Sequence, residues 1–371
     1  MLFQNNAEWR SLGGIAGAAA IIHTDAGQMQ LTQQDFAAAF PRFDPPVTDL
    51  GPEITAIYGQ SPARWFHNVT QVPDFAVTGP LAQQMWLAKH GLDVDGVLSI
   101  DPVALSYLLQ ATGPVALPSG DTLTSDNAVS LLLNDVYLRY PNPAAQNAFF
   151  ASATSAVFAA VANGAVDPGA LLAALARAGD EQRIFLWSAH PDDQARLAAT
   201  TLAGGLPVTD ATTSSFGVFL NDGTGSKMDF YQTVDTSVLW ESCTLDARGT
   251  ASGTANLTVT ITNTAPATGL PDYVTGAGSY GVAPGSANTV GYLYLPEGFE
   301  LTNAILSNGG GFGGGIHDGR RVLSFDVVLA PGESISASVA AASTTPTGSL
   351  LEARVTPGVN ANVTRPISAC L

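Results

Sequence analysis

Residues 94–115 read VDGVLSIDPVALSYLLQATGPV, and this stretch decides the fold class of the first half of the chain. Val94–Ile100 is a short, mostly apolar run that predicts a buried strand. Asp101-Pro102 combines a good helix cap with a residue favoured at the first helical position, so we expect a helix over Val103–Ala111. Gly113 is a stop signal. A strand that passes directly into a helix is the repeating unit of an α/β fold.

The same alternation of strands and helices continues to about residue 205. Further expected strands are Ile15–His23, Gln28–Thr32 and Arg183–Ser188. The helices expected from cap and stop signals are Leu81–His90, a helix capped by Thr124 or Ser125 and running through Leu133, Pro143–Ala162, Asp167 to Ala178, and His190 to about Ala203. We therefore expect residues 1–210 to form an α/β domain, a sheet covered by helices.

The composition changes near residues 205–215, after which the chain is rich in Thr, Gly, Ser and Val with period-two runs. Such alternation predicts half-buried strands, so we expect residues 211–371 to form an all-β sandwich domain. The expected strands are Ser215–Leu220, Lys227–Leu239, Thr254–Asn263, Thr289–Tyr294, Leu301–Ser307, Arg321–Leu329, Ser334–Ala342 and Leu350–Val355. The Gly223–Lys227 motif resembles part of a phosphate loop, but a strand-like run follows it, which favours a hairpin turn. Gly309–Gly315 is expected to be a mobile loop.

Charge excludes several classes of protein. The 371 residues contain 14 Lys and Arg against 31 Asp and Glu, a net charge of −17. Nucleic-acid binders and proteins that bind anionic membrane surfaces need clustered cations, so neither class fits. The low share of charged residues, 12%, with abundant Ala and Thr, resembles exported bacterial proteins. We expect an extracytoplasmic protein of the cell envelope.

The chain contains no run of 18 or more apolar residues, so we expect none of it to span a bilayer. Met1-Leu2-Phe3 resembles the tail of an apolar strand, which indicates that the first strand is truncated and that a membrane anchor lies upstream. Cys243 and Cys370 lie far apart without metal-like spacing. In an exported protein they favour a disulfide, the alternative being two buried thiols.

Arginines are scarce in the first half, where only Arg10, Arg42, Arg64 and Arg139 precede residue 177. Each is expected near a strand end or loop. If they gathered, their guanidinium groups would form a site for phosphate, to which arginine donates two hydrogen bonds at once. The alternative is four ordinary surface or ion-paired arginines.

Several polar and aromatic residues could complete such a site. Trp65 and Asn68 follow Arg64 closely, and both are candidates for binding substrate. Four aspartates could hold a divalent ion, since hard cations favour carboxylates: Asp44, Asp74, Asp95 and Asp101. For Asp101 a role as helix cap is the simpler interpretation.

Several blocks of the sequence resemble one bacterial envelope family, domain of unknown function 4012. The most specific are Gln4-Asn5-Asn6-Ala7-Glu8-Trp9-Arg10 with Gly13-Gly14, and Val94–Pro102. The other blocks are Asn68 with Pro73-Asp74-Phe75, Gly113-Pro114-Val115, Asn221-Asp222, Lys227-Met228-Asp229, Thr262-Asn263-Thr264 and Gly269–Val274. The resemblance extends over nearly the whole chain, and members usually carry an N-terminal membrane anchor.

More distantly, the layout of the first domain is similar to the LytR-CpsA-Psr phosphotransferases. These attach glycopolymers to the cell wall from polyprenyl-pyrophosphate carriers. We expect catalytic roles for Arg10, Arg42, Arg64 and Asp74, and the similarity supports the roles of Arg10 and Arg42. It implies substrate binding by Arg139, and Mg²⁺ binding by Asp44 in the Pro41–Asp44 block. Gly13-Gly14 stand where that family begins a strand with arginine and aspartate, which is a departure from its pattern.

Three functions remain open at this level. The first is transfer of glycan-phosphate from a lipid-linked glycan to a cell-wall acceptor, with Mg²⁺ and arginines neutralising the phosphates. The second is a non-catalytic envelope protein that binds carbohydrate or lipid, with Trp65, Phe66, Trp86 and Tyr140 available to stack on sugars. The third is a glycoside hydrolase, which needs two carboxylates across a cleft; Asp74 and Asp95 are the candidates.

Overall fold

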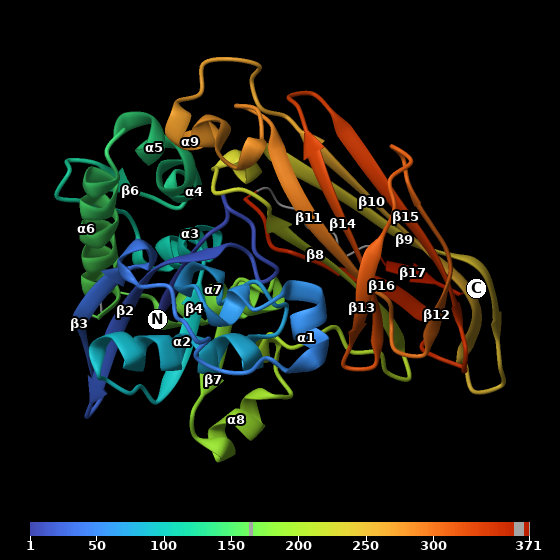
Figure 1. The fold of residues 1–371 in the computed structure, drawn as a ribbon. Helices are drawn as coiled ribbons and strands as arrows, with labels where there is room; N and C mark the ends of the chain where they lie inside the picture. The colour runs from blue at the N-terminus through green and yellow to red at the C-terminus, as the bar shows by residue number, and fades with distance from the viewer. Residues whose placement is uncertain (163–165, 360–366, 371) are drawn as a thin grey trace. The chain divides into compact units, whose positions relative to one another are not determined.

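The computed structural model describes residues 1–162, 166–359 and 367–370, and these form two compact units (Figure 1). Unit 1 comprises Met1–Asp49, Gln60–Gly205 and Leu270–Val274. Unit 2 comprises Leu50–Gly59, Leu206–Gly269 and Thr275–Leu371. The chain therefore leaves unit 1 at residue 50 and returns to it at residue 60, long before the change in composition.

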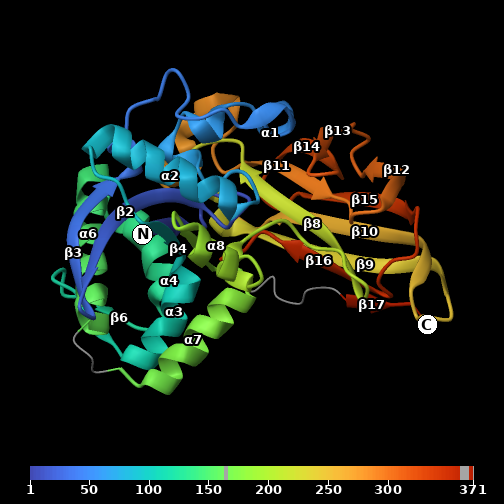
Figure 2. The ribbon, with the colours of Figure 1, turned by 90° about the horizontal axis from the view of Figure 1, so that it is seen from below.

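The described part of unit 1 is built on a five-stranded mixed sheet of order β3-β2-β1-β4-β7, of which Figure 2 labels β2, β3 and β4. Its strands are β1 (Leu2–Asn5), β2 (Ile15–Asp25), β3 (Gln28–Phe36), β4 (Gly96–Ile100) and β7 (Ile184–Ser188). β1 and β4 run parallel, and the remaining neighbours run antiparallel. The expected α/β character of the first half is confirmed, with a mixed sheet.

The helices of unit 1 follow the local signals closely. They are α2 (Phe75–His90), α3 (Pro102–Thr112), α4 (Ala128–Ser130), α5 (Val136–Arg139), α6 (Pro143–Ala162), α7 (Pro168–Asp180) and α8 (Pro191–Leu197). A π-helical turn, Leu131–Asp135, joins α4 to α5, and a short hairpin, β5 (Val115–Ala116) and β6 (Thr122–Leu123), follows α3. Ile100, Val103, Tyr107, Ala178 and Ile184 bury one core between β4, α3, α7 and β7.

Two helices differ from expectation at their ends. α2 begins at Phe75, six residues before the expected start, because Asp74 caps it by accepting a hydrogen bond from the Ala76 amide at 2.9 Å. Within α2, Gly79 passes close to β7, since a Cβ there would lie 2.3 Å from the Trp187 ring. α8 ends at Leu197 rather than near Ala203, because a separate 3-10 turn forms the last residues of that region.

α6 is the element that bears on the expectation that no part of the chain spans a membrane. It has 20 residues and a mean hydropathy of 1.2, so by length and composition it is sufficient to cross a bilayer. The sequence criterion missed it because Gln, Asn, Ser and Thr interrupt the apolar run. Length and composition do not separate such a helix from one in a soluble domain, and α6 also bonds to the sheet, where Gln34 donates to Ser155 at 2.9 Å.

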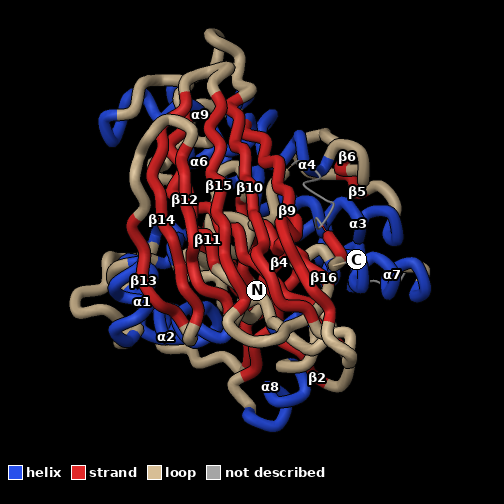
Figure 3. The backbone as a smooth tube through the Cα atoms, turned by 90° about the vertical axis from the view of Figure 1, so that its right-hand side faces the viewer, coloured by secondary structure: helices blue, strands red, loops and turns tan. Residues whose placement is uncertain are grey.

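The described part of unit 2 contains two β-sheets, which confirms the all-β character of the second half (Figure 3). One has the order β12-β15-β10-β9 and the other β13-β14-β11-β8-β16-β17. Their strands are β8 (Thr213–Asp222), β9 (Gln232–Leu245), β10 (Ala251–Asn263), β11 (Ala287–Tyr294), β12 (Phe299–Leu306), β13 (Gly313–His317), β14 (Arg320–Leu329), β15 (Ser334–Ser343), β16 (Leu350–Val355) and β17 (Ile367–Ala369). β10 shows the expected alternation, with Ala255, Leu257, Val259 and Ile261 buried.

Other details of unit 2 depart from the sequence-based expectations. Gly223–Lys227 is not a hairpin turn, because β8 and β9 belong to different sheets; a 3-10 turn, Met228–Tyr231, follows it where a strand was expected to begin. The glycine-rich loop contributes its last residues to β13. α1 (Gly51–Tyr58) was not anticipated, and neither was α9 (Asp272–Thr275), most of which belongs to unit 1. Cys243 and Cys370 form the expected disulfide.

Candidate functional site

Two segments of unit 1 bring Arg42, Asp44 and Arg64 together. Asp44 accepts a hydrogen bond from each arginine, with its Oδ1 2.8 Å from Nη1 of Arg64 and its Oδ2 3.2 Å from Nη1 of Arg42. The backbone holds the segments in register, because the Phe43 amide donates to the Arg64 carbonyl at 2.9 Å and the Val47 amide to the Ala63 carbonyl at 3.0 Å. We call Arg42, Asp44 and Arg64 the arginine cluster.

The three side chains of the arginine cluster differ in freedom. Arg64 is only 20% exposed, and Gln60 Oε1 accepts from its Nε and Nη2. Arg42 is 49% exposed and Asp44 60%. Hydrogen bonding from Arg64, followed by its positive charge, lowers the pKa of Asp44 below its ordinary value. Two cations around one carboxylate leave a net positive site on the surface of an acidic chain.

Arg10 reaches the same stretch of chain from the loop after β1. Its Nε and Nη2 donate to Asn68 Oδ1 at 3.0 and 2.8 Å, and it is only 7% exposed. Asn68 in turn donates to Ser61 Oγ at 2.6 Å. Three of the four predicted arginines are thus linked to residues 60–68. Arg64 lies in this segment, Arg42 is linked to it through Asp44, and Arg10 is linked to it through Asn68.

The loop that carries Arg10 is held by close approach. A Cβ on Gly14 would lie 2.1 Å from the Asn5 carbonyl oxygen, so only glycine fits there. The Leu12 amide donates to the Thr70 carbonyl, and Thr70 Oγ1 donates to the Gly14 carbonyl at 2.7 Å. These contacts fix the Arg10 loop against the end of the 60–68 segment.

The remaining predicted site residues lie in different settings. Trp65 lies in the 60–68 segment, with its ring 5.7 Å from that of His67. Asp74 caps α2. Arg139 donates to Asp121 at 2.7 Å, and no contact among the described residues joins it to the arginine cluster. This ion pair lowers the pKa of Asp121.

His67 is a member of this region that the sequence analysis did not single out. Burial, and then the positive charge of Arg10, lower its pKa to about 4. Its imidazole is therefore neutral at physiological pH. The five histidines of the sequence have no metal-like spacing, so only the proximity of His67 to Arg10 in space identifies it.

The residues present do not fit a resident Mg²⁺. Asp44, the expected ligand, is engaged by two guanidinium groups, and the described residues contain no group of three or more His, Cys, Asp or Glu side chains that could hold a metal. Hard cations need several oxygen ligands. In the arginine cluster, positive charge comes from arginine instead.

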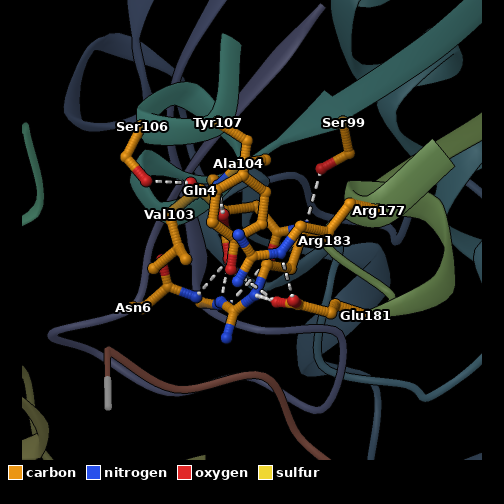
Figure 4. A network of polar contacts seen from close by, with 12 residues as sticks. Gln4, Asn6, Ser99, Val103, Ala104, Ser106, Tyr107, Arg177, Glu181 and Arg183 are labelled. Atoms are coloured by element: carbon orange, nitrogen blue, oxygen red, sulfur yellow. Dashed lines mark hydrogen bonds and ion pairs between the residues drawn. The ribbon is translucent and has the colours of Figure 1, made fainter. Parts of the chain in front are cut away.

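A second polar assembly in unit 1 is buried in the sheet (Figure 4). Asp101 caps α3 by accepting from the Ala104 amide at 2.7 Å, as expected, but its Oδ2 also accepts from Arg183 at 2.9 Å and from Asn6 at 3.1 Å. Arg183 and Asp101 are 4% and 2% exposed. Sequence reasoning could not find this ion pair, because 81 residues separate its members.

Glu181 extends this buried network towards the surface. It accepts from Arg183 and from the Tyr107 hydroxyl through Oε2, and from Arg177 through Oε1. Burial, and then the bond to Glu181, raise the pKa of Tyr107 to about 12. The charged groups of this network are paired with one another inside unit 1, so we interpret it as structural support.

The fold and these contacts define a protein with an α/β unit carrying a surface arginine cluster and with a second, all-β unit. Residues 1–137 match the model of a family described as "Protein of unknown function (DUF4012)". The match confirms the resemblance to that family over this range, which includes Arg10, the arginine cluster and the 60–68 segment. No curated protein and no solved structure matches the chain.

The lowered pKa of His67 predicts a specific pH dependence of stability. The unfolded chain takes up a proton near the ordinary histidine pKa of about 6.5, whereas the folded state takes it up only at about 4. The free energy of unfolding should therefore fall as pH decreases from 6.5 to 4. Urea unfolding across this range should show a flatter profile for H67Q, and an unchanged one for H23Q at an exposed histidine. Equal profiles for H67Q and wild type would contradict the assignment.

The buried ion pair predicts a large loss of stability when its cation alone is removed. R183M should lower the free energy of unfolding by about 3–5 kcal/mol, because it leaves the Asp101 carboxylate buried without its charged partner. R177M, which removes an exposed partner of Glu181, should have a much smaller effect. Thermal or urea unfolding measures both, and equal losses would show that burial of Arg183 is not the cause.

Proposed function

We propose that this protein binds phosphate-bearing glycans of the cell envelope at the arginine cluster. The observation that carries the proposal is the shared carboxylate of Asp44, held by Arg42 and Arg64 on the surface. A pair of guanidinium groups that accommodates one carboxylate presents the donors that bind phosphate oxygens. Trp65 lies beside Arg64 in the chain and supplies an aromatic ring that could contact a sugar.

The disulfide supports a cellular compartment for this activity. Cys243–Cys370 requires an oxidising environment to form and persist. The low charge and the resemblance to an envelope family support the same compartment. We therefore propose an extracytoplasmic protein whose partner is an envelope glycan or a lipid-linked glycan.

The reaction that we propose for this site is transfer of glycan-phosphate from a polyprenyl-pyrophosphate carrier to a cell-wall hydroxyl. The acceptor oxygen would form a bond to the glycan phosphorus, the bond to polyprenyl phosphate would break, and the hydroxyl proton would pass to the released polyprenyl phosphate. Arg10, Arg42 and Arg64 favour this candidate, since all three are attached to one short segment. Their charges would stabilise the phosphates, which is the main requirement of such transfers.

The paired-carboxylate alternative gains no support from the structure. Asp74 caps α2, and Asp95 is 95% exposed beside His190. A glycosidase needs its carboxyl groups on opposite sides of a cleft. We therefore do not propose a hydrolase.

Binding is tested by isothermal titration calorimetry of the full chain with glucose 1-phosphate. R42Q and R64Q should each weaken binding about tenfold or more, because each removes a charge-assisted donor. R196Q, which removes an exposed arginine of α8 that pairs with Asp193, is the matched control and should bind like wild type. Equal affinity for R42Q, R64Q and wild type would refute the site.

Transfer is tested by supplying a polyprenyl-pyrophosphate-linked glycan and a peptidoglycan acceptor, and measuring release of polyprenyl phosphate. Wild type should release it, and R42Q and R64Q should be at least about tenfold slower, as expected when one preorganised positive donor is lost. If the protein binds the glycan but releases no polyprenyl phosphate, the result would show a non-catalytic binding protein.

A further inference from the structure

We infer that Asp44 is an internal competitor of the ligand: its carboxylate occupies the position of the bound anion and limits the affinity of the arginine cluster. This inference rests on the proposed function, because it concerns the same site. It adds a regulating residue that neither sequence motifs nor the family match assigns.

The first argument is the geometry of the carboxylate. Its two oxygens contact two different arginines, Oδ1 with Arg64 and Oδ2 with Arg42. A phosphate placed between the same guanidinium groups would use the same two Nη1 donors. Asp44 and the ligand therefore cannot both make these contacts.

The second argument is the unequal mobility within the cluster. Arg64 is fixed by Gln60 and by the Phe43 carbonyl, whereas Arg42 forms its single side-chain bond among the described residues with Asp44. The Asp44 side chain is 60% exposed, so it can turn into solvent without losing packing. Exposed ion pairs are weak, because water competes with both partners. A dianionic ligand can displace such a carboxylate.

The third argument is the effect of the carboxylate on the empty cluster. Without a ligand, Asp44 neutralises one of two neighbouring cations and satisfies a donor on each of them. Displacement by a ligand breaks these bonds and replaces them. This cost is the same for every anion that binds between the arginines, so it lowers the affinity for each of them by the same factor. Only ligands with a high intrinsic affinity then stay bound.

The test compares wild type with D44N, which keeps the size and removes the charge. Affinities for glucose 1-phosphate and for glucuronate are measured by calorimetry at fixed ionic strength, with D193N as control, since Asp193 is an exposed carboxylate paired with Arg196. Competition predicts that D44N binds both ligands more tightly by the same factor, about two- to fivefold, which is the range expected when weak ion pairs of an exposed carboxylate are lost. D193N should match wild type.

Each other result overturns the inference in a distinct way. A clearly larger gain for the phosphate dianion than for the carboxylate would show repulsion through space, since that effect grows with ligand charge. Weaker binding by D44N than by wild type would show that Asp44 positions the arginines or takes part in binding. Absence of binding by both proteins to both ligands would refute the proposed function itself.

Discussion

The buried ion pair between Asp101 and Arg183 is the interaction on which unit 1 depends. Asp101 lies between β4 and α3, and Arg183 directly precedes β7, so the pair joins the two strands at one end. Asn6, just after β1, donates to the same carboxylate. Two buried charges are costly to desolvate unless each is paired and hydrogen-bonded. This constraint fixes where the three chain segments meet, because any other register would leave a charge unpaired.

The position of the candidate site follows from that constraint. The residues after Asn6 form a loop that Gly14 brings against Asn5, and the loop carries Arg10 to Asn68. The bonds of Leu12 and Gly14 with Thr70 attach the loop to the chain just after the 60–68 segment. The arginine cluster lies at the outer end of this chain of contacts. The Asp101–Arg183 pair is buried and hydrogen-bonded. Arg42 and Asp44, by contrast, are exposed and can exchange partners.

Local signals in the sequence predicted most elements, because caps, stops and periodicity act over a few residues. Asp101 and Asp167 cap helices as expected, and α6 has its predicted bounds. Contacts between residues far apart in the sequence could not be predicted from these local signals. The partner of Asp101 is 82 positions away, α1 shows no strong signal, and Gly223–Lys227 connects two sheets although its residues suit a hairpin. For the site, scarcity identified the arginines correctly as residues to inspect, but it could not show that Arg42 and Arg64 share Asp44, or that Arg139 belongs with Asp121.

The net charge of −17 limits how an anionic ligand can be attracted to the arginine cluster. An acidic surface repels anions at long range, so electrostatic steering does not favour a phosphate ligand. At physiological salt, however, exposed charges are screened beyond about 8 Å. Affinity must then come from contacts made within hydrogen-bond distance. The donors are the guanidinium groups of Arg42 and of Arg64, and Arg64 is held by Gln60 and the Phe43 carbonyl. A cluster of this kind would select ligands by the geometry and charge of the bound group rather than by long-range attraction, which suits the proposed recognition of one phosphate on a large glycan better than adhesion to a charged surface.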